Sequence, residues 1–133
     1  YLALGTGVAL WLTSGMPLSQ IRGVVPVLPA ILGMATLNAF NEEFVYRAAP
    51  LTTLETTIGR RHVWGLSAAF FGIAHYWGVP HGLVGVVLSI FIGWMLAKAM
   101  LETRGFFWSW WIHFLQDVVI FTFIAAGSVT PGG

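Results

Sequence analysis

The chain has 133 residues, with six Lys or Arg, five Asp or Glu and a formal net charge of +1. Its charged fraction is 8 % and its hydrophobic fraction 57 %, whereas a soluble domain carries roughly 25 % charged residues. This composition excludes a water-soluble monomer and a disordered chain, and the small net charge gives no basic surface for nucleic acid. The absence of cysteine excludes disulfides and thiolate metal ligands. We therefore predict an integral, multi-pass membrane protein in contact with the lipid bilayer.

The gaps between charged residues predict the membrane-spanning helices. Residues 1–21, 23–41 and 62–97 contain no Asp, Glu, Lys or Arg, and residues 105–133 contain one charged residue, Asp117. Because about 20 apolar residues cross a bilayer, we predict an all-α, polytopic transmembrane helix bundle with about four full spans plus a partial N-terminal one. The predicted spans, in chain order, are 1–13 (partial), 26–48, 62–78, 83–101 and 106–127.

Basic residues predict the orientation of this bundle. The loop at about 49–61 carries Arg60 and Arg61, and the loop at about 102–105 is flanked by Lys98 and contains Arg104. Two spans separate these loops, so both lie on one side of the membrane. Cytoplasmic loops carry an excess of Lys and Arg, and we therefore predict that both loops are cytoplasmic.

Five ionisable residues of the predicted spans stand out, Glu42, Glu43, His75, His113 and Asp117, and Arg47 lies close by. Such residues are costly in a membrane and are functional hypotheses by default. Glu43 and Arg47 have the i,i+4 spacing of a helical ion pair. Glu42 lies about 100° around the helix, on the face that carries Asn38. The two acids are therefore expected to have different roles, with Glu42 suited to act as a general base.

The two histidines have distinct settings. Gly65, Ala68 and Gly72 form a small-residue stripe that lets a neighbouring helix approach closely, and His75 follows at its end. His113 and Asp117 are spaced i,i+4, so the carboxylate is expected to accept an N–H of the imidazole and set its tautomer. A single buried histidine is more often a packing residue, but here three separate spans each carry an acid or an imidazole. We interpret this convergence as a catalytic site.

The chain carries three motifs whose types and order resemble those of the CPBP family, which comprises type II CAAX prenyl endopeptidases and bacteriocin-processing (Abi) proteins. Residues 42–47 read EExxxR, residues 71–75 read FxxxH and residues 113–117 read HxxxD. The resemblance covers about residues 27–120 and implies an intramembrane protease with an all-helical core. The implied substrate is a membrane-associated peptide or protein, either prenylated and CAAX-like or bacteriocin-like. We expect one transmembrane domain over 1–133, cut from a longer chain.

The resemblance also implies roles for the individual residues. Glu42 and His75 would polarise the attacking water, and His113 and Asp117 would hold the oxyanion of the tetrahedral intermediate. Glu43 and Arg47 would support the site. Many family members have Asn in place of Asp117, and an amide donates to an oxyanion directly, whereas a carboxylate does so only when protonated or acts through His113.

The predicted spans place Glu42 and His75 at different depths in the membrane. Continuation of the helix past Pro50, into residues 51–58, would bring the two side chains level. Such a continuation is tolerated inside a bundle, where neighbouring groups satisfy the backbone that a proline leaves open.

The sequence leaves open whether the protein uses a metal cofactor and whether it is an enzyme. Glu42, His75 and His113 would make a His₂Glu zinc site with one open position, in keeping with the metalloprotease label that the family has carried. The chain has no HExxH motif, and we favour hydrolysis without a metal cofactor. The alternatives to a protease are a non-enzymatic immunity or peptide-binding membrane protein and a proton or ion carrier.

Overall fold

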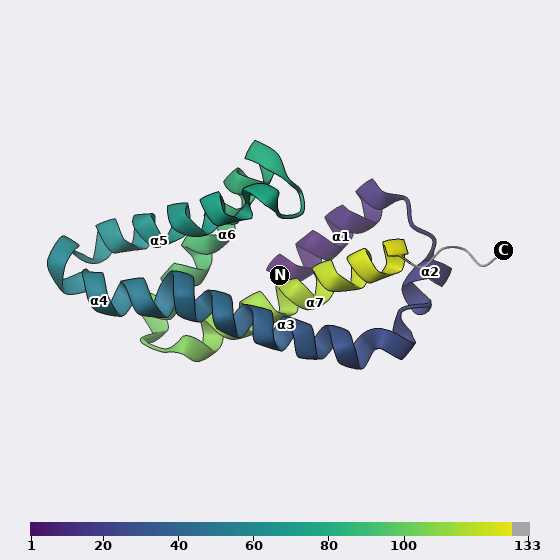
Figure 1. The fold of residues 1–133 in the computed structure, drawn as a ribbon, viewed down its shortest axis with the longest axis horizontal. Coiled ribbons are helices and arrows are strands. Elements are labelled where there is room, and N and C mark those ends of the chain that lie inside the picture. The colour runs from purple at the N-terminus through teal and green to yellow at the C-terminus, as the bar shows by residue number, and fades with distance from the viewer. Residues whose placement is uncertain (129–133) are drawn as a thin grey trace. The chain divides into compact units, whose positions relative to one another are not determined.

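The computed structural model describes residues 1–128, which form helices and short connections without any strand (Figure 1). The C-terminal residues 129–133 of the predicted domain lie outside the described residues. In chain order, the elements are α1 (Leu2–Ser14), α2 (Leu18–Arg22), the 3-10 helix η1 (Val25–Val27), α3 (Leu28–Glu43), the π-helix η2 (Phe44–Ala48), α4 (Ala49–Ile58), α5 (Arg60–Ala74), the 3-10 helix η3 (His75–Trp77), α6 (Gly82–Thr103) and α7 (Phe106–Ser128). The all-α prediction is confirmed.

Three helical segments are long and apolar enough to cross a membrane: Leu18–Ile58, Gly82–Thr103 and Phe106–Ser128. α1 is a shorter apolar helix, and α5 has only 15 residues. The predicted count of about four spans plus a partial one is therefore not confirmed.

The outer face of α6 has the character of a lipid-facing surface. Leu83, Val87 and Phe91 are spaced four residues apart, and their exposed fractions are 76 %, 63 % and 56 %. A helix that turns such a stripe of large apolar side chains outward needs an apolar surrounding. The stripe agrees with an integral membrane protein.

The loop predicted at about 49–61 is wrong, because residues 49–58 form helix α4 and the connection shrinks to Gly59. Pro50 has no N–H to donate to the Tyr46 carbonyl, which ordinarily ends a helix. Here the Ser67 hydroxyl of α5 donates to that carbonyl at 2.5 Å. The chain also widens into the π-helix η2 just before the proline. These two features let one helix continue from α3 through α4.

The described residues form two compact units. One comprises residues 41–110, and the other combines Tyr1–Phe40 with the chain from Trp111 onward. In the second unit α1 lies beside α7 (Figure 1), where the Gln116 amide donates to the Thr6 hydroxyl at 2.5 Å. The prediction of a single domain stays a prediction.

In the unit of residues 41–110, α5 and α6 pack closely side by side (Figure 1). Gly72 and Gly93 lie at the points of contact, where an added Cβ would meet atoms of the other helix. A core cluster on α4, α5 and α6 comprises Leu51, Val63, Ala97 and Met100. Ala68 and Gly72 of the predicted small-residue stripe therefore pack against α6, whereas Gly65 does not, and α5 ends at His75.

Replacement of Gly72 by Ala is expected to destabilise the fold by about 1–3 kcal/mol. The added Cβ would lie 2.8 Å from the carbonyl oxygen of Val86, a backbone atom that yields only if α5 and α6 separate. Thermal unfolding of the detergent-purified protein measures the loss. Gly65→Ala is the matched control on the same helix, since its Cβ would meet no atom within 4 Å. Equal effects of the two substitutions would contradict the packing role of Gly72.

Candidate active site

Glu43 and Arg47 form the predicted ion pair, with Arg47 Nη1 3.1 Å from Glu43 Oε1 and both side chains 0 % exposed. The Ser109 hydroxyl of α7 donates to the other carboxylate oxygen, Oε2. The guanidinium carbon of Arg47 lies 3.7 Å from the centre of the Phe71 ring, and Nη1 lies 3.4 Å from the Glu42 carbonyl oxygen. Each charge is thus met by an opposite charge and by further polar or aromatic partners, which burial in an apolar medium requires.

Glu42 and His75 form a second, more accessible pair. Their side chains are 23 % and 28 % exposed, and Glu42 Oε2 lies 3.7 Å from His75 Nε2. That distance is too long for a direct hydrogen bond. The helix continues through Pro50, and Glu42 and His75 lie level with each other. The difference in depth that the shorter predicted spans implied is therefore not found.

Phe71 fixes the orientation of His75. The Nδ1 atom of His75 lies 2.8 Å from the Phe71 carbonyl oxygen, and the two rings are 4.2 Å apart between centres. Because a carbonyl oxygen only accepts, Nδ1 carries a proton, and in the neutral ring Nε2 is the unprotonated nitrogen. The motif FxxxH therefore has a physical basis: Phe71 contacts Arg47 with its ring and orients His75 with its backbone.

His113 and Asp117 lie together in the other unit, and both are buried. His113 Nε2 is 3.6 Å from Asp117 Oδ1, which exceeds a hydrogen-bond distance. The Asn38 amide donates to Asp117 Oδ2 at 3.1 Å. The i,i+4 spacing thus brings the two residues near each other, and an amide on α3 also donates to the carboxylate.

The site residues predicted from sequence divide between the two units. Four of them, Glu42, Glu43, Arg47 and His75, belong to residues 41–110, and His113 and Asp117 belong to the other unit. The zinc set Glu42, His75 and His113 therefore draws on both. Inside either unit, the described residues contain no group of three His, Asp or Glu side chains that could hold a metal ion.

Three further polar residues make contacts that sequence reasoning did not assign: Asn38, Ser67 and Ser109. Asn38 and Ser109 share helix faces with predicted site residues, so helical periodicity carried a partial signal for them. Ser67 gave no signal of its own, because its role depends on the Tyr46 carbonyl of another helix.

Helices long and apolar enough to span a bilayer, with Glu42, His113 and Asp117 inside them, define the class of polytopic membrane proteins with polar internal groups. A family model described as type II CAAX prenyl endopeptidase Rce1-like matches residues 24–119. The match covers more than two thirds of the chain and all six predicted site residues, so the chain belongs to this family of membrane proteases. Neither the curated proteins nor the solved structures give a match.

Removal of the cation from the buried ion pair, as in Arg47→Met, is expected to destabilise the protein by about 3–5 kcal/mol, because the Glu43 carboxylate would be left uncompensated. The double variant Glu43→Gln/Arg47→Met removes both charges and is expected to recover most of that loss. Chemical unfolding of the wild type, of Glu43→Gln, of Arg47→Met and of the double variant measures the coupling. A double variant as unstable as the sum of the two single variants would contradict the pairing.

The matched control for this measurement is Arg61→Met. Arg61 is an exposed arginine on α5, and surface substitutions of this kind change stability by about 0.5 kcal/mol or less.

Proposed function

We propose that the protein is an intramembrane endopeptidase that hydrolyses peptide bonds of membrane-associated substrates with a water activated by Glu42 and His75. One observation carries the proposal: Glu42 Oε2 and His75 Nε2 face each other at 3.7 Å, and Nδ1 of His75 donates to the Phe71 carbonyl oxygen. In the proposed resting state, a Glu42 carboxylate and an unprotonated Nε2 are both hydrogen-bond acceptors. Two acceptors at this distance are stabilised by a donor that serves both, and a water molecule has two protons to donate.

The proposed reaction uses this pair as a general base and then as a general acid. As the water oxygen bonds to the carbonyl carbon of the substrate, one water proton passes to the Glu42 carboxylate. The carbonyl oxygen becomes an oxyanion in the tetrahedral intermediate. When the C–N bond breaks, the proton held by Glu42 passes to the leaving amine, and the carboxylate is restored for the next cycle.

The difference in exposure between Glu42 and Glu43 supports different roles for these neighbouring acids. Glu42 and His75 are partly exposed, whereas Glu43 and Arg47 are fully buried and matched by charge. We propose that Glu43 and Arg47 hold the helices in place and do not contact the substrate. Family membership supports peptide substrates that end in a prenylated CAAX-like or otherwise apolar segment. The basic residues Arg60, Arg61 and Arg104 support a cytoplasmic position for the connections at Gly59 and at Arg104.

Glu42→Gln is expected to lower the peptidase rate constant roughly 100–10,000-fold, because the amide does not take a proton from water. His75→Gln is expected to cause a loss in the same range. The measurement is cleavage of a library of prenylated and unprenylated C-terminal peptides by the detergent-purified protein. Full activity in Glu42→Gln would overturn the proposed role of this carboxylate.

The chain offers matched controls for both substitutions. Glu102→Gln changes a largely exposed acid that is 3.8 Å from Lys98. His62→Gln changes an exposed histidine whose Nδ1 also lies 2.8 Å from a carbonyl four residues earlier, that of Ile58. Both variants are expected to keep full activity. Binding of the peptides without cleavage by the wild type would favour the peptide-binding alternative.

A chelator arm in the same assay tests the metal-free form of the proposal. Within the unit of residues 41–110, Glu42 and His75 supply two donors, one fewer than the three protein ligands of a typical catalytic zinc. Activity is therefore expected to persist in excess EDTA. Loss of activity with EDTA and its return with Zn²⁺ would establish the zinc-dependent alternative.

We further propose that His113 and Asp117 stabilise the oxyanion. Asp117→Asn is expected to keep the rate constant within about tenfold of the wild type or raise it, because the amide has the same shape, still pairs with Asn38 and donates directly. Asp117→Ala is expected to lose about 100-fold or more. Measurement of kcat and KM for both variants distinguishes the roles, since a purely structural role would leave kcat of the folded Ala variant unchanged.

A further inference from the structure

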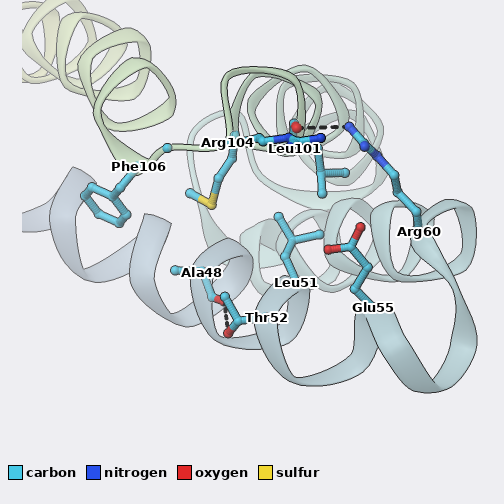
Figure 2. Close-up of a pocket in the computed structure, with 10 residues that line it drawn as sticks. Ala48, Leu51, Thr52, Glu55, Arg60, Leu101, Arg104 and Phe106 are labelled. Carbon is cyan, nitrogen blue, oxygen red and sulfur yellow. Dashed lines mark hydrogen bonds between the residues drawn. The ribbon is translucent and has the colours of Figure 1, made fainter.

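The unit of residues 41–110 contains a cavity of about 520 Å³ that is separate from the Glu42–His75 pair (Figure 2). It lies where candidate membrane-spanning helices end or begin, at Ile58, Thr103 and Phe106. The ends of membrane-spanning helices lie at the level of the lipid headgroups. The volume falls within the roughly 300–1,000 Å³ of sites for small ligands.

The wall of the cavity combines apolar and charged side chains. Leu51 on α4 and Met100 on α6 are buried, and Phe106 begins α7. The charged groups are Glu55, Arg60 and Arg104, from α4, from α5 and from the turn after α6. Figure 2 shows Glu55, Arg60 and Arg104 around the same space as Leu51 and Phe106. The lining therefore suits an amphiphile with a charged end.

The cations of this cavity are available to a ligand. Among residues 1–128, the guanidinium of Arg104 and the carboxylate of Glu55 form no hydrogen bond or ion pair. Arg60 donates one hydrogen bond, from Nη2 to the Leu101 carbonyl at 2.9 Å, and its remaining donors are left for other acceptors. Guanidinium groups bind phosphate with two parallel hydrogen bonds, which makes arginine the preferred residue for such recognition.

We propose that this cavity binds the headgroup of a phospholipid that carries a primary ammonium group. Arg60 and Arg104 hold the phosphodiester, Glu55 accepts the ammonium, and the apolar wall contacts the glycerol and the start of the acyl chains. Two positive charges and one negative charge complement this headgroup sign by sign, and basic pockets at the ends of membrane helices are known lipid sites. The site is independent of the proposed peptidase reaction.

The test is native mass spectrometry of the full chain in detergent, with phosphatidylethanolamine, phosphatidylglycerol and phosphatidylcholine of matched acyl chains. The wild type is expected to retain phosphatidylethanolamine at least fivefold more than phosphatidylcholine, whose quaternary ammonium donates no hydrogen bond. Arg104→Asn is expected to lower retention of phosphatidylethanolamine and of phosphatidylglycerol at least tenfold. Asn suits the left-handed backbone of Arg104, whose φ is 51°.

Glu55→Gln tests the contact with the ammonium group separately from the contact with the phosphate. This variant is expected to lose the preference for phosphatidylethanolamine over phosphatidylcholine and to keep phosphatidylglycerol. Arg61→Ala, which changes the neighbouring arginine outside the cavity, is expected to leave all three lipids unchanged. Arg60→Gln serves as a second test of the phosphate contact and is compared with the wild type by thermal unfolding.

Two results would overturn the proposal. Retention of every lipid at the wild-type level in both Arg104→Asn and Arg60→Gln would show that these arginines hold no phosphate. Equal binding of soluble glycerophosphoethanolamine and of phosphatidylethanolamine would show that the apolar wall takes no part, and the site would then be one for a free phosphate ester.

Discussion

The buried ion pair of Glu43 and Arg47 constrains the unit of residues 41–110 more than any other contact. An uncompensated charge in an apolar medium costs several kcal/mol, so the chain must bring matching groups to each end of the pair. The arginine receives the face of Phe71 from α5, and the carboxylate receives the Ser109 hydroxyl from α7. That hydroxyl also lies 3.0 Å from the Leu96 carbonyl of α6. One ion pair thereby joins four helical segments within residues 41–110.

The same constraint reaches the candidate catalytic histidine through Phe71. Once its ring lies under Arg47, its carbonyl oxygen is placed one helical turn before His75 and holds Nδ1. The protonated Nδ1 leaves Nε2 to face Glu42. The adjacent carboxylates have different environments because neighbouring helical residues point about 100° apart. Glu43 points to its buried cation, and Glu42 points to an imidazole in a partly exposed position.

Sequence patterns were sufficient for what depends on local periodicity. Gaps between charges gave the ends of α6 and α7 to within two residues, and the i,i+4 rule gave the pair of Glu43 and Arg47. The patterns failed where a contact from another helix decides the outcome. The sequence allowed the helix to end before Pro50 or to continue into residues 51–58, and the longer form is present, with the Ser67 hydroxyl satisfying the carbonyl that the proline leaves open. The Asn38 partner of Asp117 is hidden for the same reason, because 79 residues separate them.

Two arginines of this chain show how position in a membrane decides the use of one residue type. Arg47 is fully buried, so other groups of the protein must neutralise its charge. Arg104 lies in the turn between two candidate spans, where lipid phosphates supply counter-charge in abundance. The fold therefore gains nothing by providing Arg104 with an internal partner. A guanidinium left open at that level, beside an apolar cavity, is a group whose natural partner is the bilayer rather than the protein.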